Sequence, residues 1–211
     1  MSKQTNSILY LDHQEITSSK SLVRAYRKRI REQGFTGKTL FYKDEAQYQR
    51  KLHHFAELLR ANVTPTDTLL DVGCGYGSLV QLLPKCIYKG IDIVPDFVSR
   101  AREQYPLNHF ELTDIDSEPG CYDWCVLLGV VNTIAEPRRV VDAAWKRCSK
   151  GLMVDFIDGQ KLGDSNFLNR FDIPDCLSYF LGLSVRCVEV RPTSDVWTIF
   201  IARKAEAMVK E

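Results

Sequence analysis

From residue 68 onward, short apolar runs alternate along the chain with segments whose apolar residues recur at helical spacing. The runs predict strands at 68–72, 87–92, 109–112, 122–128 and 151–156. The segments between them predict helices at 77–83, 95–104, 137–148 and 166–182. Strands that alternate with helices in this way indicate an α/β fold, with a mostly parallel sheet, right-handed crossovers and helices on both faces.

The end of the chain breaks this alternation. Two β-branched runs, 184–190 and 196–202, are joined by the turn Arg191-Pro192-Thr193-Ser194-Asp195. Two such runs on either side of a short turn predict a hairpin. We therefore expect the last strand to run antiparallel to its neighbours.

The first sixty residues carry a different pattern, with helices predicted at 18–33 and 44–59. Ser18 or Ser19 would cap the first helix, and Gly34 would end it. The second helix has one apolar stripe, formed by Tyr48, Leu52, Phe55, Leu58 and Leu59. We expect a single compact protein, with a helical cap or extension at 1–60 and an α/β core at 61–211.

Composition narrows the class of protein. The 211 residues are 45% hydrophobic with a net charge of +1, so a real core is expected and no overall field favours nucleic acid or a membrane. No apolar run is long enough to cross a bilayer. The seven cysteines include no C-x-x-C pair, so neither a zinc site nor a redox pair is predicted. These features favour a cytoplasmic protein.

The stretch from Leu69 to Gly77 reads as a buried strand that runs into a glycine-rich turn. Asp71 lies at the end of the strand, and Gly73, Gly75 and Gly77 follow at alternate positions. Glycine reaches positive φ without steric cost and lets the backbone approach a ligand closely. A dinucleotide site would instead need G-x-G-x-x-G ahead of a helix that receives a pyrophosphate. A tight turn with no ligand is the third interpretation.

With its acidic residue and three glycines, this stretch resembles the first motif, D-x-G-x-G-x-G, of the class I S-adenosylmethionine (SAM)-dependent methyltransferases. The resemblance extends over about residues 68–204. It implies a Rossmann-like seven-stranded sheet with an antiparallel last strand, SAM as cofactor and S-adenosylhomocysteine (SAH) as product. In that family Asp71 would hold the turn and the amino-acid end of SAM, and Cys74 would be the small side chain within the loop.

Asp92 ends the second predicted strand, 21 residues after Asp71. A carboxylate there accepts two hydrogen bonds at once, which matches the two ribose hydroxyls of a nucleoside. The alternative is that Asp92 caps the helix that begins near Pro95. The following residue, Ile93, belongs to the same predicted cofactor segment.

The third and fourth strands end in further candidate contacts. The resemblance implies that Asp114 accepts a hydrogen bond from the adenine amino group, with Thr113 and Ile115 beside it. Asp116 is an alternative contact, and Asp114 is alternatively a residue of a surface turn. After the fourth strand, Gly129 and Val130 would line the methionine part of SAM. Asn132 would face the acceptor or cap the helix near Pro137.

A second resemblance lies ahead of the first strand. Gln47-Tyr48-Gln49-Arg50 is similar to a Q-x-x-R segment of some small-molecule methyltransferases, which implies that Arg50 pairs with the SAM carboxylate. Tyr42 or Tyr48 would then lie over the ligand. The alternative is an exposed arginine and core tyrosines.

Four residues are candidates for a general base, which is needed only if the acceptor must lose a proton. They are His53, His54, Asp155 and Asp158, and histidine titrates near neutrality. The Asn-Pro-Pro-Tyr motif of exocyclic-nitrogen enzymes and the Pro-Cys pair of pyrimidine C5 enzymes are absent from the sequence. Phe156 follows Asp155, so the Asp-Asn pair of catechol-type enzymes is absent and no metal is predicted.

The sequence therefore predicts a methyltransferase that acts on an oxygen, nitrogen or carbon of a small molecule. We expect residues 1–50 and 157–182 to shape the acceptor pocket, with Phe167, Phe171, Tyr179 and Phe180 as candidate walls. An RNA or protein methyltransferase is the alternative, since the first helix has a basic face that is otherwise a solvated surface: Arg24, Arg27, Lys28, Arg29 and Arg31. A non-catalytic SAM-binding protein is a third possibility, and the chain's state as monomer or homodimer stays open.

Overall fold

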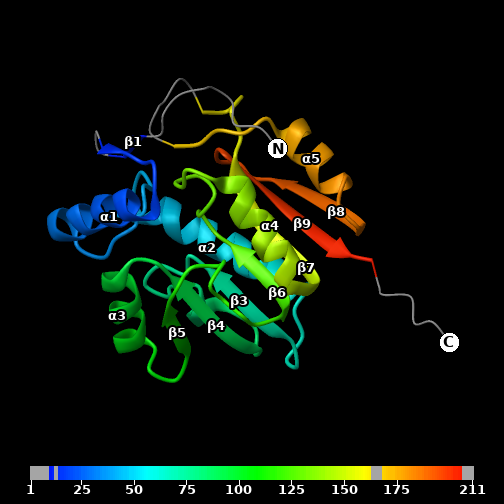
Figure 1. Ribbon diagram of the computed structural model, residues 1–211, viewed down its shortest axis with the longest axis horizontal. Coiled ribbons are helices and arrows are strands. Elements are labelled where there is room, and N and C mark those ends of the chain that lie inside the picture. The colour runs from blue at the N-terminus through cyan, green and yellow to red at the C-terminus, as the bar shows by residue number, and fades with distance from the viewer. Residues whose placement is uncertain (1–9, 12–13, 163–167, 206–211) are drawn as a thin grey trace.

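The structure, a computed structural model, describes residues 10–11, 14–162 and 168–205. Its centre is a seven-stranded sheet in the order β5-β4-β3-β6-β7-β9-β8 (Figure 1). The strands are β3 (Thr68–Val72), β4 (Ile87–Asp92), β5 (His109–Leu112), β6 (Tyr122–Leu127), β7 (Cys148–Ile157), β8 (Val185–Pro192) and β9 (Trp197–Lys204). A separate short pair, β1 (Tyr10–Leu11) and β2 (Gln14–Glu15), is antiparallel.

The direction of the strands confirms the predicted topology. Strands β3 to β7 pair in parallel, whereas β9 is antiparallel to both of its neighbours, β7 and β8. The sheet is therefore Rossmann-like, with one reversed strand that the hairpin in the sequence predicted. The predicted strands agree with the structure to within a residue or two, except that β7 begins earlier, at Cys148.

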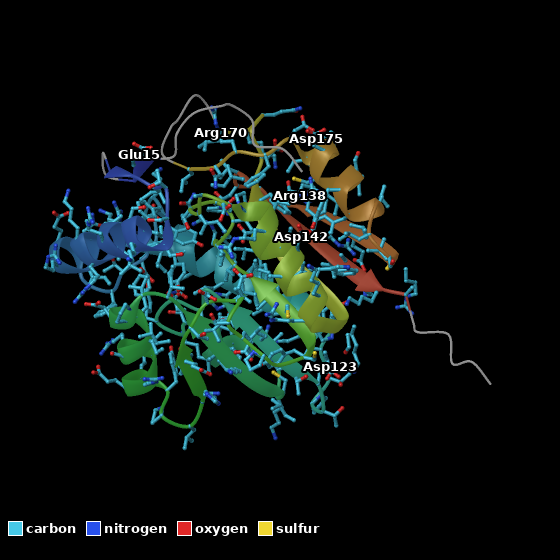
Figure 2. All side chains as sticks on the ribbon, viewed as in Figure 1. Glu15, Asp123, Arg138, Asp142, Arg170 and Asp175 are labelled. Carbon is cyan, nitrogen blue, oxygen red and sulfur yellow. The ribbon has the colours of Figure 1, made fainter. Side chains whose placement is uncertain are left out.

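Helices cover both faces of the sheet. Neighbouring residues of β3 show why, since Leu69 and Leu70 are both fully buried but belong to separate apolar clusters on opposite faces. Helices α2 (Glu45–Arg60) and α3 (Pro95–Gln104) pack on one face. Helices α4 (Pro137–Arg147) and α5 (Ile173–Leu181) pack on the other. The outer face of α4 is charged, with Arg138 and Asp142 one turn apart (Figure 2).

The first two helices begin where the sequence predicts. Helix α1 (Ser19–Gln33) starts with a capping box, in which Ser18 and Ser21 bond to each other's backbone N–H. Asp44 caps α2 by accepting a hydrogen bond from the backbone N–H of Gln47 at 2.8 Å. Helix α2 is part of the core, since Phe55 and Leu59 on its inner face are fully buried. Helix α2 and the sheet therefore share one core.

Two predicted helices are shorter than expected. Of the segment 77–83, only Val80–Leu82 is helical, as a single 3₁₀ turn (η1). Pro84 disfavours a helical conformation at Leu83, so too few residues remain after the glycine turn for a stable helix. The helix predicted at 166–182 begins only at Ile173, because Phe171 pairs with Asp158 in an isolated bridge and Pro174 occupies the first turn.

The predicted basic face of α1 is smaller than its sequence indicates. Arg29 is 7% exposed, donates to the backbone oxygens of Lys38 and Thr39, and lies over the Phe41 ring at 4.0 Å. Arg27 forms an ion pair with Asp96 at 3.0 Å. Arg29 thus joins α1 to the following turn and is not part of a surface patch. Among the described residues, no helix has the length and apolar character that crossing a bilayer requires.

Candidate functional site

A cavity lies beyond the carboxyl ends of the central strands. Strand β3 has β4 on one side and β6 on the other, so the chain reverses its direction of progress across the sheet at this point. Ligands bind at such a switch point in open α/β sheets. Asp71 and Gly73 line the cavity from β3, Asp92 lines it from β4, and Gly129 lines it from the loop after β6.

The glycine turn approaches the opposite loop closely. Gly73, Gly75 and Gly77 all have positive φ, at 69°, 57° and 80°. The N–H groups of Gly73 and Cys74 both donate to the backbone oxygen of Ile91, at 2.7 and 3.0 Å, which ties the turn to β4. A Cβ on Gly73 would lie only 2.5 Å from Cγ2 of Val130. Glycine is therefore needed at position 73 for its conformation and for its size.

Two buried carboxylates face this turn. Asp92 accepts hydrogen bonds from the backbone N–H groups of Gly75 (2.9 Å) and Val94 (2.8 Å), one on each oxygen. Asp71 accepts a hydrogen bond from the Tyr88 hydroxyl at 2.9 Å. A carboxylate has about four lone-pair positions, so Asp92 keeps acceptor capacity after these two bonds.

Burial perturbs both acids. It raises the pKa of Asp71 to about 7, although the hydrogen bond from Tyr88 acts in the opposite direction. It also raises the pKa of Asp92 to about 6, against the effect of the backbone N–H groups of Val94, Gly75 and Ile93. Two buried acids with raised pKa values in one cavity are typical of a site for a cationic or hydroxyl-bearing ligand.

One end of the cavity is lined by the residues after β5. Thr113, Asp114 and Ile115 lie there, as does Ile93 after β4. Asp114 is exposed, and its Oδ1 accepts a hydrogen bond from the backbone N–H of Ser117 at 2.8 Å. The alternative contact, Asp116, is outside the lining and forms an ion pair with Arg139. This end therefore combines apolar side chains with one accessible carboxylate.

The other end is formed by Gly129, Val130 and Tyr42. Gly129 has a φ of 82°, and a Cβ there would lie 3.3 Å from the Tyr42 hydroxyl oxygen. The Gly129 N–H donates to Asp155 Oδ1, and Lys51 donates to Asp155 Oδ2 at 2.6 Å. Gly129 is thus adjacent to a tyrosine that lines the cavity and to a buried ion pair that accepts its N–H.

Residues that precede β3 close the cavity. The sequence predicts only that residues 1–50 shape the acceptor pocket, without naming the residues of α1. Ile16 lines the cavity from the segment between β2 and α1, and Leu22 and Tyr26 line it from α1. Leu40, which precedes α2, and Tyr48 and Leu52 of α2 complete this side. The Tyr26 hydroxyl reaches the hydroxyl of Thr133 at 3.4 Å, and burial raises the pKa of Tyr26 to about 12. The apolar spacing of Leu22, Ala25 and Tyr26 on α1 could have indicated this buried face.

Seven residues predicted for the site, the candidate base Asp158 among them, do not line the cavity. Arg50 is largely exposed and lies 3.8 Å from Asp195, and Gly77 faces Tyr105 and Phe110. His53 is exposed on α2, because it is two positions from the buried Lys51 and so lies on the opposite side of the helix. The others are His54, Asn132 and Asp155. Asn132 and Asp155 are buried and hydrogen-bonded to each other at 2.9 Å.

The expected pocket walls at 157–182 also belong elsewhere. Phe171, Tyr179 and Phe180 pack in the core beneath α5, with Phe171 against Phe156 and Phe180 stacked on Phe200. Within the described part of 157–182, no residue lines the cavity. Phe167 lies outside the described residues.

The middle of the chain is similar in sequence to known methyltransferases. The family model described as "Methyltransferase domain" matches residues 70–153, which include the glycine turn, Asp92 and the loop after β6. A malonyl-[acyl-carrier protein] O-methyltransferase of Anoxybacillus flavithermus is 31% identical over 81 residues, covering 36% of this chain and 30% of that protein. A ribosomal protein L11 methyltransferase of Burkholderia ambifaria is 43% identical over 60 residues, covering 27% of this chain and 20% of that protein. The match thus spans less than a third of either relative.

Similarity of fold extends over most of the chain. The crystal structure of magnesium protoporphyrin IX methyltransferase from Synechocystis PCC 6803 with bound SAM has a TM-score of 0.67 and 17% sequence identity. The superposition covers 89% of this chain and 98% of that one. This likeness establishes the fold. The match of residues 70–153 to the methyltransferase model agrees with the resemblance that the glycine turn indicated.

Proposed function

We propose that this chain is an enzyme that binds SAM and transfers the methyl group to a small-molecule acceptor, with SAH as product. The match of residues 70–153 to a methyltransferase model and the likeness in fold to a SAM-bound methyltransferase support the proposal. One observation carries the proposal. Asp71, the positive-φ glycine turn and Asp92 converge at the switch point of the sheet, on a cavity that residues of the N-terminal segment cover.

The residues of the cavity fit the adenosine half of SAM. Asp92 is held by two backbone N–H groups and retains acceptor capacity for the two ribose hydroxyls. Ile93 and Ile115 supply apolar surface for the adenine ring, and Asp114 lies at the same end as an acceptor for its amino group. The alternative that Asp92 caps α3 fits less well. Asp92 lies three residues before the first residue of α3, and Val94 occupies the N-cap position of that helix.

The opposite end fits the methionine half. Asp71, at the start of the glycine turn, would receive the positively charged amino group, because a carboxylate favours a cation beside it. Gly129 and Val130 lie across the turn and would line the sulfonium end. Tyr42 lines the cavity next to Gly129, where it would lie over the ligand.

SAM supplies an already activated methyl group, so the protein's task is to position the acceptor and exclude water. Tyr26, Tyr42 and Leu22 provide this enclosure, since they close the cavity from the N-terminal side. A cover of this kind favours a small acceptor over a bulky one. The oxygen, nitrogen or carbon nature of the acceptor stays open.

An RNA or protein acceptor is the second candidate, and a ribosomal protein is named in the relative from Burkholderia ambifaria. The surface that would dock such a partner is the basic face of α1. Arg29 points inward and Arg27 is paired with Asp96, which leaves Arg24, Lys28 and Arg31. Lys28 is itself 3.9 Å from Glu32. These contacts weaken the candidate.

The proposal is tested by calorimetric titration of the wild type with SAM, SAH and NAD. Micromolar binding of SAM and SAH without binding of NAD is expected. Asp92→Ala should weaken SAM binding by about 10- to 100-fold, because it removes charged hydrogen-bond acceptors worth about 1.5–3 kcal/mol. Asp96→Ala is the matched control, since Asp96 lies outside the cavity lining and pairs with Arg27. A folded wild type that binds no SAM would refute the proposal.

A further inference from the structure

A buried ion pair lies behind the wall of the cavity. Lys51 on α2 and Asp155 on β7 are 2.6 Å apart, and their side chains are 3% and 0% exposed. The Lys51 ammonium also lies 4.3 Å from the Trp197 ring centroid and 5.3 Å from that of Tyr42. Burial lowers the pKa of Lys51, while Asp155 acts to raise it. Such a pair is costly to bury and needs good geometry to be tolerated.

Asp155 connects this pair to the loop after β6. Its Oδ1 accepts the N–H of Gly129, and its Oδ2 accepts the side-chain N–H of Asn132 at 2.9 Å. The Asn132 oxygen in turn accepts the backbone N–H of Ile157 at 2.9 Å. Both oxygens of Asp155 are thus occupied by groups that fix the loop. This arrangement explains why Asp155 and Asn132 do not face the cavity.

The loop that is fixed in this way is the wall of the cavity at one end. Gly129 and Val130 line the cavity, whereas Lys51, Asn132 and Asp155 do not. A Cβ on Gly129 would lie 4.0 Å from Lys51 Nζ and 3.3 Å from the Tyr42 hydroxyl oxygen, so the ammonium lies directly beside two residues that line the cavity. Lys51 therefore connects α2, which covers the cavity, to the loop after β6, which bounds it.

We propose that Lys51 is a positioning residue for the methyl-donor end of the site, acting through Asp155 on Gly129. This inference rests on the proposed function for its ligand. Lys51 neutralises Asp155, and the paired carboxylate then holds Gly129 at its positive φ and orients Asn132. The pair carries no net charge, so it adds no repulsion toward a sulfonium in the cavity.

Removing one charge at a time separates positioning from general stability. In Lys51→Met the Asp155 carboxylate loses its charged partner, so it holds the Gly129 N–H less firmly. SAM and SAH should therefore bind about tenfold more weakly. Adenosine, which lacks the methionine part, should bind within about twofold of wild type, because its contacts lie at the Asp92 end. Asp155→Asn leaves an uncompensated ammonium behind Gly129, so it should weaken SAM more than the uncharged thioether SAH.

Two further variants complete the experiment. Lys51→Met with Asp155→Asn removes both charges, so the ratio of SAM to SAH affinity should return to that of wild type while both ligands stay weaker. Lys89→Met is the matched control. It breaks a contact of 2.8 Å to Glu118, whose side chain is 1% exposed, and neither residue lines the cavity. This control should alter the melting temperature but none of the three affinities.

The result that overturns the proposal is a parallel loss of adenosine and SAM affinity, or no loss of either, in Lys51→Met. If that variant does not fold, the double variant decides by the same comparison. Hydrogen exchange of the amides of residues 129–133 gives a readout that needs no ligand. It should accelerate in the double variant relative to Lys89→Met, and equal exchange would contradict the proposal. A wild type that binds no SAM would refute the proposed function alone, and the exchange result would still test Lys51.

Discussion

At the scale of single residues, the charged forms of Asp71 and Asp92 lower the stability of the free protein, and we expect them to stabilise its complex with SAM. Their folded pKa values of about 7 and about 6 exceed the ordinary value for aspartate, about 3.9. Between pH 4 and 7 the folded chain therefore binds more protons than the unfolded chain. The contribution of these groups to the free energy of unfolding falls as pH rises through this window.

The affinity for SAM should have the opposite dependence on pH. The deprotonated acids are the forms that accept ribose hydroxyls and attract a cation, so binding should weaken as pH falls through 7 and then 6. Titration calorimetry at pH 8 and pH 5.5 should show a loss of about tenfold or more. In Asp71→Asn, binding at pH 8 should be weaker and the dependence on pH shallower. An unchanged affinity between pH 8 and 5.5 in the wild type would contradict this assignment.

At the scale of elements, the glycine turn and the loop after β6 act as one unit, because Gly73 and Val130 are in close contact. Their junction is the point at which the sheet changes its strand order. A side chain at position 73 would have to displace the loop that lines the methionine end of the cavity. The turn therefore determines the shape of the site as well as its own conformation.

Gly73→Ala tests this coupling. A non-glycine residue at positive φ costs about 1–2 kcal/mol of stability, and the contact with Val130 should add a loss of SAM affinity of about tenfold or more. Gly34→Ala is the matched control, because Gly34 has a φ of 67° but no atom within 4 Å of the added Cβ. It should lower the melting temperature without changing SAM affinity. Adding Val130→Ala to Gly73→Ala should restore part of the affinity, and no recovery would argue against the contact.

The elements also show what the sequence could and could not predict. The strands of the sheet are predictable because they are apolar runs. The location of Asp71 and Asp92 at the cavity is predictable because each lies at the end of a strand. Lys51 was missed because a lysine within an amphipathic helix usually faces solvent. Its partner Asp155 is 104 residues away in sequence, so only the fold brings them together. His53 and His54 are candidates for a general base because of their chemistry, and that chemistry does not indicate which side of α2 they occupy.

At the scale of the whole molecule, the N-terminal segment is part of the site and part of the core. Helix α2 buries Phe55 and Leu59 against the sheet, and α1 with β2 covers the cavity through Ile16 and Leu22. The predicted boundary at residue 60 therefore separates two sequence patterns and does not mark a break in the hydrophobic core. The helices before it share their packing with the strands after it, so binding at the cavity should stabilise both parts together.

Methyl transfer to a small molecule is tested most directly by following the methyl group itself. SAM labelled in its methyl group is incubated with the protein and a cell extract separated into small-molecule, RNA and protein fractions. We predict that the wild type transfers label to the small-molecule fraction and that Asp92→Ala transfers far less. Label in the RNA or protein fraction alone would contradict the small-molecule assignment. No transfer to any fraction by a protein that binds SAM would contradict catalysis.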